Sequence, residues 1–92
     1  MPGGGRPAAL RMEWSEEALT MLGDLAEWKP AACRRAVAEM ERMARAGFNY
    51  GRGVEPGRWY WPAGDVGVFY GATASTLRVR AVVDAKRLRE LP

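Results

Sequence analysis

The sequence contains no histidine and only one cysteine among its 92 residues. These two residue types supply most structural zinc ligands and the thiol–imidazole pairs of many hydrolases. Their scarcity argues against a zinc site, a thiol–imidazole active site and an intrachain disulfide. We therefore expect no metal and no cofactor. Cys33 falls on the apolar side of a predicted helix, where a core role is favoured over a reactive one.

Long apolar runs are also absent, since no segment approaches the ~18 residues that a membrane span requires. The first residues, Met1 to Pro7, have no apolar signal core. We interpret residues 1–8 as a flexible lead-in and residues 9–92 as a single domain. The hydrophobic content of 48% is high enough for a packed core. A soluble cytoplasmic protein without membrane contact is the resulting expectation.

The net charge of +3 is unevenly distributed along the chain. Residues 1–45 carry seven basic and seven acidic groups, whereas residues 46–92 carry seven basic and four acidic groups. Such an asymmetry indicates an anionic partner. Considered alone, the charge is explained equally well by a general enrichment in arginine.

The first half of the sequence has the periodicity of one strand followed by two helices. Residues 9–14 alternate between apolar and polar side chains, which is typical of a half-buried strand. Ser15 then caps a helix whose apolar stripe runs to Trp28 at 3.6-residue spacing. Pro30 starts a second helix, and Gly47 is placed to end it. We expect the two helices to form an antiparallel hairpin.

Residues 47–57 contain four glycines and one proline, which predicts a loop. A phosphate-binding glycine loop was weighed against this, but the sequence lacks the required spacing and leads into a strand. Three alternating strands follow, separated by Pro/Gly and Gly/Ser turns. They cover residues 58–61, 66–70 and 76–84. The predicted order is β-α-α-β-β-β, an α+β fold with a helical hairpin packed on a small, mainly antiparallel sheet.

Alternation also predicts which side chains share a face of this sheet. Arg78, Arg80 and Val82 should lie on the face away from the helices, where Arg58 and Tyr60 can join the two arginines. The residues predicted to face the helices on the last strand are Leu77, Val79, Ala81 and Val83.

Aromatic rings beside guanidinium groups suit RNA, because bases stack on rings and arginine binds phosphates. The alternative is that the aromatic residues fill the core. For Trp59 and Trp61 the core role is favoured, since aromatic strands are usually packed ones.

Three motifs together resemble the RelE/ParE toxin superfamily. They are Met12–Ala18 at the strand-to-helix junction, Gly64–Tyr70, and Leu77–Val83 followed by Lys86-Arg87. The resemblance extends over about residues 9–90 and includes the β-α-α-β-β-β order. It departs from the family at Gly67, where an arginine is usual, and at the C-terminus, which lacks an aromatic residue.

This resemblance implies a bacterial toxin of a type II toxin–antitoxin system that is neutralised by a cognate antitoxin. The RelE branch cleaves mRNA on the ribosome and inhibits translation, whereas the ParE branch inhibits DNA gyrase. A catalytically inactive binding module is a third reading. Either a homodimer or a hetero-oligomer with the antitoxin is compatible with the resemblance.

The RelE-type reaction uses arginine, lysine and sometimes tyrosine in place of histidine, so a chain without histidine is compatible with it. Carried over by position, the resemblance implies two sets of site residues. The catalytic candidates are Arg58, Arg78, Lys86 and Arg87. The candidates for RNA binding are Arg52, Tyr60, Arg80 and Arg89.

Overall fold

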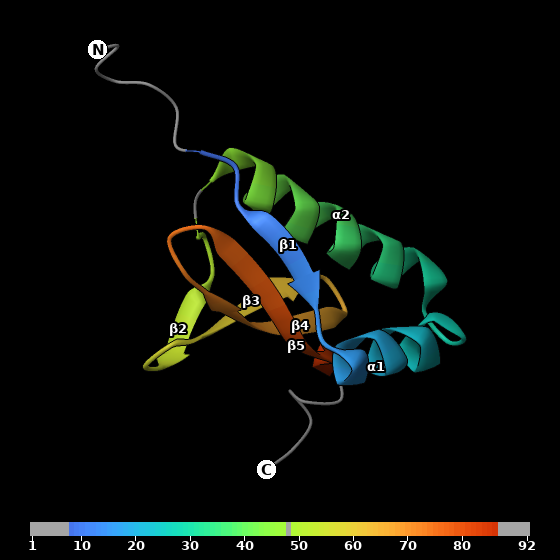
Figure 1. The fold of residues 1–92 in the computed structure, drawn as a ribbon. Coiled ribbons are helices and arrows are strands. Elements are labelled where there is room, and N and C mark those ends of the chain that lie inside the picture. The colour runs from blue at the N-terminus through green and yellow to red at the C-terminus, as the bar shows by residue number, and fades with distance from the viewer. Residues whose placement is uncertain (1–7, 48, 87–92) are drawn as a thin grey trace, which may run out of the picture.

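The computed structural model describes residues 8–47 and 49–86. Two helices form one layer and a five-stranded mixed sheet forms the other (Figure 1). The elements are β1 (Arg11–Trp14), α1 (Glu16–Ala26), α2 (Pro30–Ala46), β2 (Arg52–Glu55), β3 (Arg58–Ala63), β4 (Val66–Ala72) and β5 (Thr76–Asp84). The predicted α+β class is confirmed. The predicted lead-in at residues 1–8, apart from Ala8, lies outside the described residues.

The sheet has the strand order β1-β5-β4-β3-β2. β1 pairs with β5 in parallel, and the other neighbours are antiparallel. The first strand of the chain therefore lies beside the last. As a result, two strands that are far apart in the sequence lie side by side at one edge of the sheet (Figure 1).

The prediction of a continuous loop over residues 47–57 is wrong, because β2 forms within it and pairs with β3. The glycine content predicts a loop, but Gly53 pairs with Trp59 of β3. A Cβ atom at Gly53 would lie at an ordinary contact distance of 3.5 Å from the Trp59 ring, so this position of the strand does not require a glycine. Gly57 takes the positive φ of 78° at the turn between the two strands. The chain therefore has one more strand than its alternation pattern predicts.

Both helices begin where the sequence predicts. The Ser15 side chain accepts a hydrogen bond from the Ala18 backbone N–H at 3.0 Å, which caps α1. Pro30 is the first residue of α2, and Gly47 ends that helix with a φ of 73°. The apolar stripe of α1 stops earlier than predicted, however. Trp28 lies beyond the helix and is 82% exposed.

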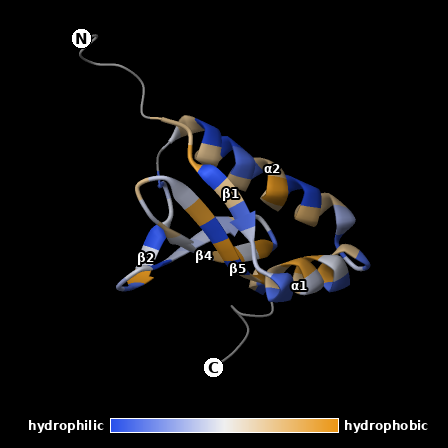
Figure 2. Ribbon diagram, in the orientation of Figure 1, coloured by the Kyte–Doolittle hydropathy of each residue, from blue (hydrophilic) through white to orange (hydrophobic). Residues whose placement is uncertain are grey.

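The core lies between the helices and the inner face of the sheet, as the alternation of hydrophobic and hydrophilic residues along the ribbons indicates (Figure 2). Trp59 and Trp61 are partly buried against it, which confirms their predicted packing role. The indole Nε1 of Trp61 donates a 2.8 Å hydrogen bond to Glu39 on α2. The most completely buried large side chains are Tyr70, Met40, Leu77, Val66, Val68 and Val79.

A β-bulge in β5 changes which residues face the helices. Tyr70 pairs with Val79, but the preceding Phe69 pairs with Ala81, so Arg80 has no partner in the register. Beyond the bulge Val82, not Ala81 or Val83, joins the core. The predicted orientations of Ala81, Val82 and Val83 are therefore wrong, because simple alternation cannot anticipate an extra residue.

Among the described residues, no helix has both the length and the apolar character needed to cross a membrane.

Candidate functional site

The sheet face turned away from the helices, here called the outer face, carries aromatic and basic groups in one row. In the strand register Arg52 lies opposite Tyr60, and Tyr60 lies opposite Phe69. The rings of Tyr60 and Phe69 are 4.8 Å apart and tilted by 48°. The Arg58 guanidinium lies 5.8 Å from the centre of the Phe69 ring. Antiparallel pairing of β2, β3 and β4 therefore joins two rings and two arginines.

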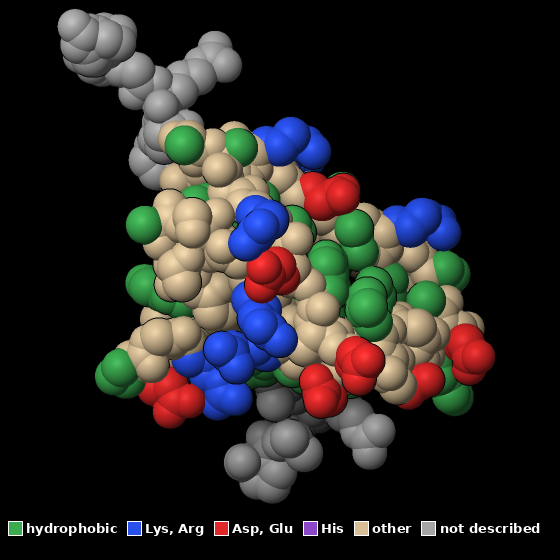
Figure 3. Space-filling model, in the orientation of Figure 1, with side chains coloured by type: hydrophobic (Ala, Val, Ile, Leu, Met, Phe, Trp, Pro, Cys, Tyr) green, Lys and Arg blue, Asp and Glu red, His purple; other side chains and the backbone are tan. Residues whose placement is uncertain are grey.

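A hollow lies beside this row, where β1, the β2–β3 turn, β4 and β5 meet. Arg78 and Arg80 line it together with Glu13, Gly57 and Gly71. Gly71 lies opposite Arg78 in the register, and a Cβ atom there would be 3.3 Å from Nε of Arg80. The glycine therefore lets the Arg80 side chain lie close to the sheet. In Figure 3 basic side chains gather over the strands with an acidic group among them.

Arg58 is held near the rings by an ion pair, with its guanidinium 2.8 Å from Glu55. Arg78 has a looser partner, since its guanidinium lies 3.9 Å from Glu13. More than half of each arginine side chain is exposed, so both remain accessible to an anion from solvent. Exposed pairs of this kind are weak and can exchange partners.

Gly67 lies directly beneath the ring of Tyr60. A Cβ atom at Gly67 would be 2.6 Å from Cε1 of Tyr60, which is too close for any side chain without movement of the ring. At the position where the resemblance leads one to expect an arginine, an aromatic ring therefore covers the strand instead. At this point the outer face therefore presents the aromatic ring of Tyr60, on which a base can stack, and no cation.

Of the site residues predicted from the sequence, the structure brings five together on the outer face: Arg52, Arg58, Tyr60, Arg78 and Arg80. The hollow lies near the start of β5, whereas Lys86 follows the last residue of that strand. The backbone N–H of Lys86 donates a hydrogen bond to the Asp84 side chain at 3.1 Å. Lys86 does not join the cluster. Arg87 and Arg89 lie outside the described residues.

Glu13 is a member of the hollow that sequence reasoning missed. It lies opposite Arg78 because β1 pairs with β5. The alternation of residues 9–14 does place Glu13 on the polar face of its strand. The pairing partner of that strand, however, depends on the tertiary fold and leaves no local signal.

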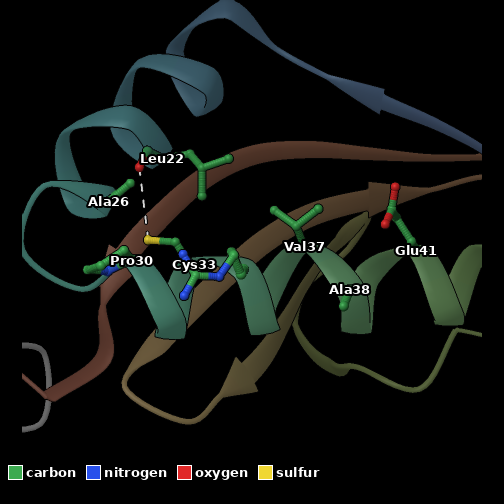
Figure 4. Close-up of a pocket in the computed structure, with 8 residues that line it drawn as sticks. Leu22, Ala26, Pro30, Cys33, Val37, Ala38 and Glu41 are labelled. Carbon is green, nitrogen blue, oxygen red and sulfur yellow. Dashed lines mark hydrogen bonds between the residues drawn. The ribbon is translucent and has the colours of Figure 1, made fainter.

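A second concave surface lies between the two helices and is apolar (Figure 4). Leu22 and Ala26 of α1 face Cys33 and Val37 of α2, and Figure 3 shows hydrophobic side chains lining a hollow there. The Cys33 thiol is buried, and its Sγ lies 3.9 Å from the Leu22 carbonyl oxygen, to which it donates. Burial raises the pKa of this thiol, as expected of a packed cysteine rather than a reactive one.

Within residues 8–47 and 49–86, no group of three or more cysteine or carboxylate side chains is placed to hold a metal ion. No protein-family model matches this sequence, and no curated protein matches it either. The outer face therefore has to be interpreted from its own chemistry. Its arginines can bind phosphates, and its paired rings can stack on bases.

Proposed function

We propose that this protein is the toxin of a type II toxin–antitoxin system and that its outer face binds and cleaves mRNA on the ribosome. The observation that supports this most directly is the position of Arg78 and Arg80 beside the Tyr60–Phe69 ring pair. One face thus offers guanidinium groups for phosphates and rings for unpaired bases. The reaction in this proposal, cleavage of mRNA on the ribosome, is that of the RelE branch, which the chain resembles in the order of its elements and in its motifs.

In this proposal each group on the outer face has a distinct role. Tyr60 and Phe69 stack on bases of the bound strand and set its position. Arg58 and Arg52 hold the backbone beside the rings. Arg78 and Arg80 bind the phosphate at the cleaved bond and stabilise the negative charge that develops there. Arginine cannot exchange protons near neutral pH, so these two groups act electrostatically.

A translation reaction with purified components tests the proposal. The wild-type protein at micromolar concentration should cleave mRNA when ribosomes are present and leave it intact when they are absent. Replacing both Arg78 and Arg80 with alanine should lower the rate at least ~100-fold, because loss of one charged stabiliser commonly costs that much. Primer extension on the mRNA measures both the rate and the cleavage position.

The matched control replaces Arg42 and Arg45 with alanine on the exposed side of α2. It removes the same charge from the other layer and should leave the rate within a factor of about three. Intact mRNA with the wild-type protein, on ribosomes and off them, overturns the proposal. In that case a supercoiling assay with DNA gyrase tests the ParE-type activity.

A non-catalytic RNA-binding module is the second candidate, and the position of Gly67 under the Tyr60 ring favours it. The outer face lacks a cation at this point and has an additional stacking surface. Such a module would bind single-stranded RNA with the same dependence on Arg78 and Arg80 but would leave the strand uncut. Cleavage of an RNA that the protein is shown to bind distinguishes the two candidates, because only the endonuclease cuts the bound strand.

The partner in this proposal is a cognate antitoxin that covers the outer face or the apolar groove between the helices. Co-expression of the toxin with the protein of a neighbouring reading frame should restore growth and yield a stable complex. The ribosomal target requires a cytoplasmic location. A protein that does not slow bacterial growth when expressed alone contradicts the toxin assignment.

A further inference from the structure

Cleavage of RNA through its own 2′-hydroxyl needs a group that accepts the hydroxyl proton. The usual group, histidine, is absent from the sequence. Arginine stays protonated and cannot serve as a base. The end of β5 that carries Lys86 is the one opposite to the hollow. No tyrosine is among the described residues that line the hollow. A carboxylate beside the phosphate-binding arginines is the remaining chemistry that fits.

Glu13 is the one carboxylate among the described residues that line the hollow. The parallel pairing of β1 with β5 places it opposite Arg78, with its Oε1 3.9 Å from the guanidinium. Arg80 lines the same hollow. A phosphate bound by the two arginines would therefore lie next to an oxygen atom able to accept a proton.

The contacts of Glu13 leave its carboxylate available. Its Oε2 lies 3.5 Å from Nε of Arg11, and neither this contact nor the one to Arg78 is short enough for a strong charge-assisted hydrogen bond. The side chain is 38% exposed. An arriving phosphate competes for Arg78 and frees the carboxylate for the neighbouring ribose.

From this geometry we infer that Glu13 is the proton acceptor of the cleavage reaction, an assignment that depends on the proposed function. The Glu13 carboxylate takes the proton of the 2′-hydroxyl, and the 2′-oxygen forms a bond to the adjacent phosphorus. The bond from phosphorus to the 5′-oxygen breaks, and that oxygen takes a proton from water. The products are a 2′,3′-cyclic phosphate and a 5′-hydroxyl, and Glu13 then releases its proton to solvent.

The substitution Glu13→Gln tests this, because it keeps the size of the side chain and removes the base. The rate of ribosome-dependent cleavage should fall ~10²–10⁴-fold, the usual contribution of a general base. Binding to a strand with 2′-O-methyl ribose at the cut position should stay within threefold or tighten, since a negative charge beside the phosphate is lost. Mass spectrometry of the wild-type product should show the cyclic phosphate.

Glu27→Gln is the matched control, because Glu27 is exposed next to α1 in the helix layer. It should leave both the rate and the binding unchanged. Cleavage by Glu13→Gln within threefold of the wild-type rate overturns the assignment while the proposed function stands. An equal loss of binding and cleavage also overturns it, since Glu13 would then only order the hollow. A wild-type protein that cuts no RNA overturns both.

Discussion

The ring of Tyr60 fills the space above Gly67 and rests against Phe69. These three residues lie on neighbouring positions of β3 and β4, and none of them belongs to the hydrophobic core cluster. The absence of a side chain at residue 67 is therefore a packing requirement of the outer face.

Replacing Gly67 with alanine is expected to displace the Tyr60 ring and lower the free energy of unfolding by about 1–3 kcal/mol, the usual cost of overpacking. Urea denaturation measures the change. In a Tyr60→Ala background the ring is gone, so the same glycine replacement should cost almost nothing. Equal losses in the two backgrounds would contradict this explanation.

The ionisation of Tyr70 on the buried sheet face makes the stability of the protein depend on pH. Tyr70 is fully buried, and its hydroxyl donates to the Asn49 side chain. Burial raises the pKa of Tyr70 to about 12, with a smaller opposing effect of the Gly51 backbone N–H. The unfolded chain ionises this phenol near pH 10. The contribution of the buried, neutral Tyr70 to the free energy of unfolding is therefore complete below pH 10 and is lost as the pH rises toward 12.

We expect the free energy of unfolding to fall by about 2 kcal/mol between pH 9 and 12 from this group. Tyr70→Phe cannot ionise and should show a correspondingly flatter decline, even if it is less stable at neutral pH. Denaturation at stepped pH values measures both slopes. Trp28→Phe, at an exposed position without an ionisable group, should keep the wild-type slope. Parallel curves for the wild type and Tyr70→Phe would exclude Tyr70 as the cause.

At the level of single elements, the helices were predictable because their signals are local. The cap at Ser15, the proline at position 30 and the glycine at position 47 all act within one helical turn. Trp28 was misplaced because the apolar spacing continues past the end of α1, and spacing alone does not show where a helix stops.

The strands were predictable only where alternation holds without interruption. The orientation of Arg78 follows from alternation, and the bulge at Arg80 then reverses the pattern for Ala81 and Val83. β2 was missed because its glycines indicate a loop, although Gly53 pairs with Trp59 of β3. The arginines and Tyr60 of the candidate site could be grouped from the sequence, but Glu13 could not, because its neighbour is set by tertiary pairing.

The N-cap of α1 gives a prediction for one element. Ser15→Ala removes the acceptor for the Ala18 backbone N–H and should lower the free energy of unfolding by about 1 kcal/mol. Ser15→Asp should retain most of the stability, because aspartate also caps well. Thr20→Ala, at an exposed position within the same helix, serves as the control. A larger loss at Thr20 than at Ser15 would show that the cap is not what stabilises α1.

Across the whole molecule, one lysine joins the two layers. Lys29, between α1 and α2, places its Nζ 3.1 Å from Asp84 at the end of β5 and 3.9 Å from Asp65 in the β3–β4 turn. Its side chain is only 23% exposed. The ion pairs therefore fasten the helix connection to the sheet end that lies away from the hollow.

Lys29→Met keeps the aliphatic stem and removes the charge, which leaves Asp84 without this partner. The free energy of unfolding should fall by about 1–3 kcal/mol, as for other hydrogen bonds to charged groups. Chemical denaturation measures the loss, and Lys86→Met on the exposed surface is the control. An unchanged midpoint in Lys29→Met would show that the ion pairs of Lys29 do not stabilise the packing of the two layers.

The pairing of the first strand with the last has a consequence for the timing of folding. Contacts between distant parts of a chain form late, because a long loop must close before they contribute any stability. The edge that combines Glu13 with Arg78 cannot form until β5 has been synthesised and has left the ribosome. A nascent chain therefore has no complete hollow. On the proposed function, the activity therefore appears only after β5 has left the ribosome and has paired with β1.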